Sequence, residues 1–252
     1  MQPSVHIVRL LGKSIVMRIS FSLLLSALFY LSANAQIENI KINDFQVIYV
    51  FGPFRVDLVK ADAPSVKIDY HGVDKEAITV KSKDGDLTIR FKNKDFVDFE
   101  DGPWRRNRVR FTNVTIYYTQ LEAIEARAGA LIESTETINA KKIFLVSKMG
   151  SQMKLSINAQ NLELESSMGS EVDLSGVADR LTVRSKMGSD VNASALKSQH
   201  VTVSSSMGSE VSVYAEDELD ASADFGASIT YRGNPSMRHT SKFLGAEVNR
   251  KN

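Results

Sequence analysis

Short runs of alternating apolar and polar residues recur along most of the chain. Clear examples are Leu87-Thr88-Ile89-Arg90-Phe91 and Val109-Arg110-Phe111-Thr112. Alternation with a period of two is typical of β-strands that have one buried face and one solvated face. No segment after residue 36 has a convincing helical period. The pattern therefore predicts an all-β fold.

The first half of the chain is rich in Val, Ile, Phe, Tyr and Thr, and turn signals such as Gly52-Pro53 and Asp84-Gly85 interrupt it. These features predict separate strands. The predicted strands cover residues 46–51, 54–60, 65–70, 77–81, 86–91 and 108–119.

The second half contains one phrase written four times, Ser-Lys-Met-Gly-Ser or Ser-Ser-Met-Gly-Ser, at 147–151, 166–170, 185–189 and 205–209. Weaker copies at 128–130, 225–227 and 244–246 extend the series, so that glycines recur every 18 to 21 residues. A near-constant period of this length indicates a solenoid of stacked units.

Aligning the units on their glycines gives columns of small or apolar residues. We predict that these columns point inward and that the positions between them face solvent. The columns lie three, five and seven places before the glycine and three and five places after it. A further predicted inward column directly precedes the glycine: Ala128, Met149, Met168, Met187, Met207, Phe225 and Leu244.

Two short strands per unit without helical spacing favour a β-helix of about 19-residue coils over other solenoids. Each glycine is expected at a corner, where a Cβ would strain the backbone or crowd the next coil. We predict a β-rich part over 36–120 and the repeats over 121–252. Thr240 and Lys242 replace apolar column members, so residues 236–252 are expected to form a degenerate C-terminal cap coil.

Residues 1–35 have the features of a signal peptide. Arg18 precedes the apolar run 19–31, and Ser32-Ala33-Asn34-Ala35 fits a cleavage site. Met17 is a better start for such a peptide than Met1. An uncleaved membrane anchor is the alternative, but the apolar run is shorter than the ~20 residues of a spanning helix. We therefore expect an extracytoplasmic protein, in the periplasm, on the cell surface or secreted, with no span after cleavage.

Charge and cysteine content exclude several classes of function. Loss of Arg9, Lys13 and Arg18 with the leader leaves 28 basic residues against 30 acidic ones, so the balance does not indicate nucleic-acid binding. The chain has no cysteine. Disulfides, thiolate zinc sites, cysteine nucleophiles and lipidation of a leader cysteine are therefore excluded.

The repeats resemble the head GIN domain family of auto-transporter adhesins. The resemblance rests on Met-Gly-Ser-Glu-Val at 168–172 and 207–211 and on Met-Gly-Ser-Asp-Val at 187–191, with methionine where the family usually has a small residue. Residues 45–50, 55–58 and 114–124 resemble the family's N-terminal half. The resemblance implies a right-handed parallel β-helix in an exported, non-enzymatic protein, and it supplies no catalytic or binding residues.

Two repeated columns are candidate ligand sites. Met149, Met168, Met187 and Met207 have thioethers that suit Cu(I), but we interpret them as core residues, because the column continues as phenylalanine and leucine. Glu171, Asp190 and Glu210 form an outward row of carboxylates that suits Ca²⁺. A solvated face, neutralised by Lys148 and Lys186, is the alternative. No other cofactor is expected.

The loop 93–107 holds the only tryptophan, and Trp104, Arg105, Arg106 and Arg108 have the composition of a binding hot spot. The alternative is a loop that covers one end of the core. The histidines show neither metal-ligand nor nucleophile spacing. We therefore predict a structural or adhesin-like binding module for an unknown protein or glycan partner. The alternatives are a small-molecule, glycan or cation binder that uses the outward carboxylates, or an enzyme that acts on polysaccharides.

Overall fold

The computed structural model describes residues 37–70, 73–92 and 111–251. We describe the compact unit that begins at Asn39. Its described part is built from β-strands, with one short 3-10 turn, η2 (Lys75–Ala77). No helix among the described residues is long and apolar enough to cross a membrane. The all-β prediction is confirmed.

The first N-terminal strand was not predicted, and the other six match the predicted segments closely. The N-terminal strands are β1 (Ile37–Lys41), β2 (Val47–Phe51), β3 (Phe54–Lys60), β4 (Ser65–Asp69), β5 (Ile78–Lys83), β6 (Asp86–Phe91) and β7 (Thr112–Tyr118). β4 pairs with β7 and β5 pairs with β6 in antiparallel fashion. β2 and β3 instead pair in parallel with β8 and β9, so the stack of coils already begins at β2.

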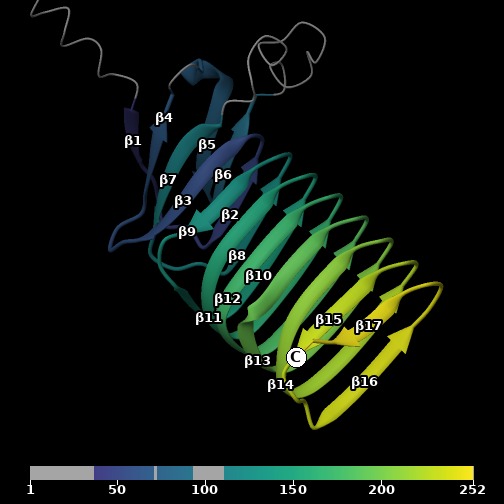
Figure 1. Ribbon diagram of the computed structural model, residues 1–252. Helices are drawn as coiled ribbons and strands as arrows, with labels where there is room; N and C mark the ends of the chain where they lie inside the picture. Colours follow the sequence, from purple (N-terminus) through teal and green to yellow (C-terminus); the bar gives the residue numbers. More distant parts are fainter. Residues whose placement is uncertain (1–36, 71–72, 93–110, 252) are drawn as a thin grey trace, which may run out of the picture. The chain divides into compact units, whose positions relative to one another are not determined.

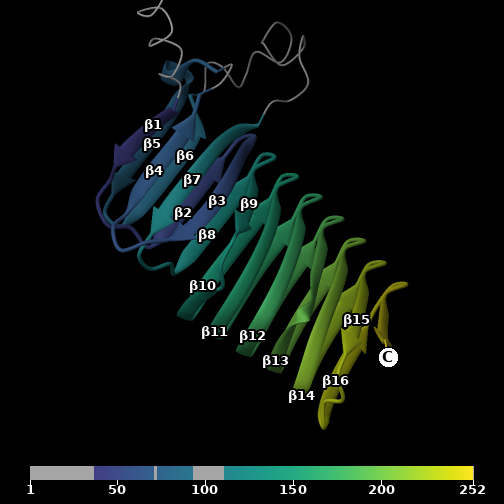
Figure 2. The ribbon, with the colours of Figure 1, turned by 60° about the vertical axis from the view of Figure 1, so that its left-hand side comes forward.

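The repeats form a β-solenoid of about seven turns (Figures 1 and 2). Consecutive coils pair in parallel, so that Leu164 lies beside Val183 and Val183 beside Val203. The strands are β8 (Ala123–Arg127), β9 (Leu131–Ser134), β10 (Ile138–Lys148), β11 (Gln152–Ser167), β12 (Glu171–Lys186), β13 (Asp190–Ser206), β14 (Glu210–Asp224), β15 (Ser228–Arg232), β16 (Met237–Lys242) and β17 (Glu247–Arg250). The prediction of two short strands per coil is wrong for β11 to β14, each of which runs as one continuous strand of 15–17 residues from one corner to the next.

Most of the predicted inward columns are buried. In the coil of β12, for example, Val172, Leu174, Leu181 and Val183 are at most 2% exposed. The same positions are filled by apolar residues in the neighbouring coils, which gives one continuous core. The last coil departs from this pattern, because Arg238, Thr240 and Lys242 pair with the buried Leu219, Ala221 and Ala223. The predicted domain boundaries at residues 35 and 120 stay predictions.

The prediction that the methionine column points inward is wrong. Met149, Met168, Met187 and Met207 are 40–53% exposed, and Phe225 and Leu244 continue the exposed series. In each corner the residue before the glycine and the glycine itself both have positive φ, as at Met207 (56°) and Gly208 (69°). The alternation of side chains holds only along extended backbone, so it is interrupted at these two left-handed residues and resumes with the buried serine after the glycine.

The corner is a tight turn of type I′. The amide of Ser209 donates to the carbonyl oxygen of Ser206 at 3.4 Å, and positive φ at both central residues defines this turn type. A Cβ at Gly208 would meet nothing within 4 Å. The glycine is therefore required for its left-handed backbone, and the expected crowding against the next coil is absent there.

The serine after each corner glycine is buried and joins neighbouring coils. Ser170 Oγ donates to the carbonyl oxygen of Ser147 in the preceding coil at 2.8 Å and lies 2.9 Å from Ser166 Oγ. Ser151, Ser189 and Ser209 make equivalent contacts. In two weaker copies the serine pair becomes an alanine pair, Ala126 with Ala130 and Ala223 with Ala227. When both serines of a pair are replaced by alanine, no hydroxyl remains that lacks its hydrogen-bond partner.

We predict that Ser170→Ala lowers the free energy of unfolding by about 1–3 kcal/mol, because it leaves a buried carbonyl and the Ser166 hydroxyl without this partner. Adding Ser166→Ala should cost less than the sum of the two single changes. Urea denaturation measures both effects, with the exposed Ser204→Ala as control. A Ser170→Ala variant no less stable than Ser204→Ala would show that the serines do not hold the coils together.

Candidate functional site

The corners separate two outward faces of the solenoid. The acid face contains the outward residues after the corners, at 152–156, 171–175, 190–194 and 210–214. The lysine face contains the outward residues before the corners, at 142–148, 161–167, 180–186 and 200–206. The corners themselves line up along one edge of the stack (Figure 1).

The predicted carboxylate row lies on the acid face. Glu171, Asp190 and Glu210 are register partners on consecutive coils. One position further along, Asn192 Nδ2 donates to Asp173 Oδ1 at 3.0 Å. Partial burial raises the pKa of Asp190, and the negative charges of Glu210 and Asp173 raise it further.

Among the described residues, no group of three or more His, Asp or Glu side chains is arranged to hold a metal ion. None of the ion pairs between described residues includes Glu171, Asp190 or Glu210. The calcium hypothesis stays a prediction. Trp104, Arg105, Arg106 and Arg108, the other predicted site, lie outside the described residues.

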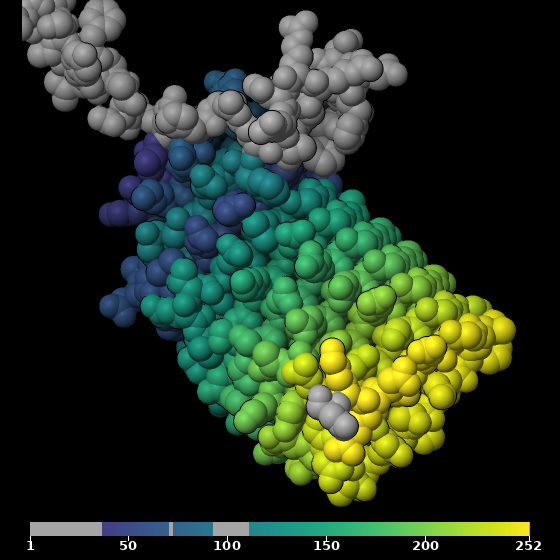
Figure 3. Space-filling view, in the orientation of Figure 1, coloured from purple at the N-terminus to yellow at the C-terminus, as the bar shows by residue number. Residues whose placement is uncertain are grey.

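An apolar ridge runs along the corners between the two faces. We define it as Met149, Met168, Met187, Met207, Phe225 and Leu244, each on the next coil. The amide of each corner glycine donates to the carbonyl oxygen of the ridge residue on the following coil, as from Gly169 to Met187 at 3.1 Å and from Gly188 to Met207 at 3.1 Å. The ridge residues are thus held in register from coil to coil. Figure 3 shows the coils packed side by side along the stack.

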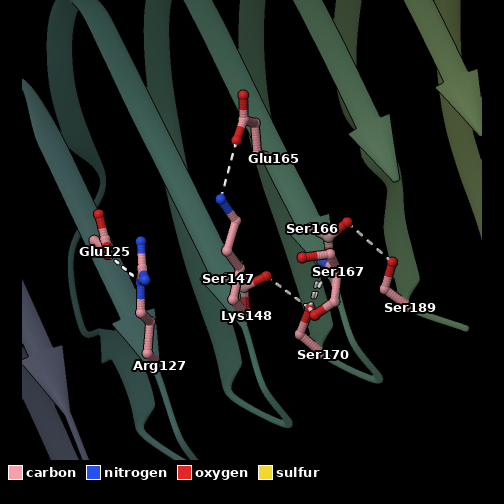
Figure 4. Close-up of polar contacts among 9 residues, drawn as sticks. All are labelled: Glu125, Arg127, Ser147, Lys148, Glu165, Ser166, Ser167, Ser170 and Ser189. Atoms are coloured by element: carbon pink, nitrogen blue, oxygen red, sulfur yellow. Dashed lines mark hydrogen bonds and ion pairs between the residues drawn. The ribbon is translucent and has the colours of Figure 1, made fainter. Parts of the chain in front are cut away.

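The lysine face contains a hollow centred on Ser167. This serine pairs in register with Lys148 on one side and Lys186 on the other, so a small residue lies between two long ones. Its side chain is buried, and its hydroxyl has no hydrogen-bond partner in the described structure. Figure 4 shows Ser167 beside Lys148, which pairs with Glu165 at 3.2 Å.

The hollow has a volume of about 180 Å³. Its charged lining residues are Lys148, Glu165, Arg184 and Lys186, and Ser204 and Ser206 add hydroxyls. Glu165 offsets one of the three cations. The ion pairs between described residues include neither Arg184 nor Lys186. An excess of positive charge therefore surrounds a buried hydroxyl that is free to donate.

A second hollow, of about 250 Å³, lies on the same face. Lys142, Glu163 and Arg180 line it, and Lys142 Nζ lies 2.8 Å from Glu163 Oε1. Arg180, Arg184 and Lys186 all belong to β12, so the cations without an acidic partner follow one strand. This arrangement suits an extended ligand that carries several anionic groups.

Sequence reasoning did not identify this hollow. The sequence analysis interprets Lys148 and Lys186, across the corner from the carboxylates, only as residues that neutralise them. The signal lies in the column two places before the glycine, where Ser167 stands between the two lysines. Arg184 belongs to the next outward column, and nothing in the spacing alone indicates that it shares the hollow.

A family model described as "Putative auto-transporter adhesin, head GIN domain" matches residues 44–235. Among curated proteins, none matches the chain. A solved structure of a "putative adhesin" from Bacteroides fragilis is similar at 17% identity, with a TM-score of 0.74, over 85% of this chain and 96% of that one.

Two further solved structures come from Parabacteroides distasonis. One, a "putative adhesin", has 17% identity and a TM-score of 0.62, over 85% of this chain and 96% of that one. The other, a "putative lipid binding protein", has 18% identity and a TM-score of 0.58, over 87% of this chain and 98% of that one. These likenesses support the fold.

We predict that Asp190→Asn stabilises the protein at neutral pH. The raised pKa means that the folded state disfavours the charged carboxylate, so the stabilising contribution of Asp190 is present below its ordinary pKa of 3.8 and is lost as pH rises through the raised value. The advantage of the variant over the parent should shrink as pH falls through this range. Urea melts at several pH values measure this, with the exposed Asp179→Asn as control. An equal advantage for Asp190→Asn at all pH values would contradict the assignment.

Proposed function

Because the chain belongs to the head GIN domain family of auto-transporter adhesins, we propose that it is an exported, non-enzymatic binding module of the cell envelope or surface. The leader-like residues 1–35 support export. The description of the family and the solved structures described as "putative adhesin" support a binding role. The regular outer faces of the coils offer an extended surface on which a partner can bind without chemical change.

The ligand class follows from the hollow on the lysine face. The observation that carries the proposal is the Ser167 hydroxyl, which is buried, has no partner and lies between Lys148 and Lys186. A buried hydroxyl without a partner is costly, and a ligand oxygen that accepts its hydrogen removes that cost. A carboxylate or sulfate group also takes charge-assisted hydrogen bonds from lysine and arginine.

We therefore assign an acidic glycan as the ligand. The hollow of about 180 Å³ has room for one carboxylate or sulfate with some water. A sugar chain that extends along β12 reaches Arg184 and then Arg180 with its next acidic groups. A neutral glycan would leave these cations and the serine hydroxyl without their counterparts.

Binding to polygalacturonate and heparin, with neutral dextran as control, tests this proposal by calorimetry. The acidic polymers should bind and dextran should not, and the affinity should fall with salt. Arg184→Gln should weaken binding on the order of tenfold, which corresponds to one charge-assisted hydrogen bond. The matched control is Lys154→Gln, which removes one positive charge from the acid face.

Ser167→Ala separates binding from folding. Loss of the hydroxyl should weaken polymer binding while leaving thermal stability equal or higher, because the folded protein gives this hydroxyl no partner. If Lys154→Gln weakens binding as much as Arg184→Gln, the polymer is attracted by the overall positive charge of the protein and the hollow is not the site. If dextran binds like the acidic polymers, the assigned ligand class is wrong.

A further inference from the structure

The apolar ridge is maintained at a cost in backbone energy. Each ridge residue lies in the left-handed region, with φ from 44° at Leu244 to 61° at Met149. This conformation costs a residue other than glycine about 1 kcal/mol or more, and asparagine or aspartate tolerates it better. Asn-Gly is the favoured pair in a type I′ turn. Six consecutive corners nevertheless have an apolar residue there, and that residue is exposed.

Folding alone does not explain these side chains. They are not buried in the core, and a polar residue at the same place would relieve both the strain and the exposure. A contiguous exposed apolar strip of this kind marks a surface that another molecule covers. The thioether is not the shared property, because the strip continues as Phe225 and Leu244. An apolar partner therefore explains the whole ridge better than a soft metal does.

The charges beside the ridge indicate which partner fits. On the lysine face, Lys148 and Lys186 directly precede ridge residues. On the acid face, the row Glu171, Asp190 and Glu210 follows two places after the corner glycines. Anionic lipid would be attracted to one flank and repelled by the other. A partner with an apolar strip between one acidic and one basic flank complements both, and a second copy of this chain has that arrangement.

Symmetry decides how two copies fit. A two-fold axis parallel to the stacking direction places ridge against ridge and brings the lysine flank of each copy opposite the acid flank of the other. Lys186 and Asp190 flank the same corner. Lys186 of one copy therefore lies opposite Asp190 of the other copy, and the two contacts form at the same coil. A two-fold axis perpendicular to the stacking direction would instead bring lysine to lysine and acid to acid. Both copies have the same coil spacing, so every corner can match.

We propose that two copies of the protein associate side by side in parallel across the apolar ridge, with Lys186 of each copy paired with Asp190 of the other. This interface goes beyond the glycan site, and Arg184 and Ser167 are not part of it. Lys186 lies at the border of the two surfaces. Experiments on the methionines therefore test the ridge separately from the hollow.

Sedimentation equilibrium over roughly 1 μM to 1 mM tests the association. The parent should form dimers as concentration rises. Met168→Asn with Met187→Asn should weaken dimerisation by on the order of a hundredfold, since two half-exposed apolar anchors are lost. The melting temperature at a fixed low concentration should stay equal or rise, because asparagine suits the turn. Thr202→Asn, on the lysine face, is the matched control and should dimerise like the parent.

Charge reversal tests the pairing and the direction of the axis. Lys186→Glu alone and Asp190→Lys alone should each lose dimers through repulsion. An equimolar mixture of the two variants should restore them, because both contacts then join opposite charges. A perpendicular axis predicts instead that each single variant dimerises like the parent, because like charges face each other in all three, and that only the mixture gains dimers.

Three outcomes would overturn the proposal. They are a monomeric parent at all concentrations, methionine variants that dimerise like the parent, and a mixture that stays monomeric. Binding of the monomeric parent to vesicles of neutral and anionic lipid, lost in the methionine variants, would assign the ridge to a membrane instead.

Discussion

The left-handed Met-Gly turn is the constraint on which the rest of the repeat depends. Two consecutive residues with positive φ reverse the chain within one tight turn, and the glycine amide then donates to the corner of the next coil, as from Gly150 to the Met168 carbonyl oxygen at 3.0 Å. The serine that follows is directed inward and donates to the preceding coil. One turn thus fixes the direction of the chain and the spacing of its neighbours.

The same turn divides the surface of the solenoid. Residues before it form the lysine face, residues after it form the acid face, and the residue at its first central position stands exposed between them. Stacking places equivalent positions of consecutive coils beside one another, so each outward position of the repeat becomes one member of a row of side chains. The hollow arises where one row contains a side chain much smaller than its neighbours, because Ser167 lies between Lys148 and Lys186. Regular architecture and local irregularity therefore shape different parts of the outer surface.

Periodicity in the sequence was enough to predict the solenoid, six of the seven N-terminal strands and five of the six inward columns, but not that the two halves of a coil join into one continuous strand. Val172, Val183 and Leu174 are buried as expected, because side chains along extended backbone point alternately inward and outward. The sixth column failed at Met168 and its equivalents, since alternation does not extend through a left-handed turn. The hollow could not be predicted, because it depends on which outward residues from three coils lie beside one another. The Trp104 loop lies outside the described residues, so that part of the prediction stays as it was.

Methionine oxidation tests the exposed corner most directly. Five methionines of the repeats serve as reporters, because Met153 is inward and 2% exposed whereas Met149, Met168, Met187 and Met207 stand at the corners. Brief treatment of the folded protein with dilute hydrogen peroxide, followed by peptide mass spectrometry, gives the rate of sulfoxide formation at each. The corner model predicts fast oxidation of the four corner methionines and protection of Met153 until the protein is unfolded. Equal protection of all five would place the corner methionines in the core and contradict the account.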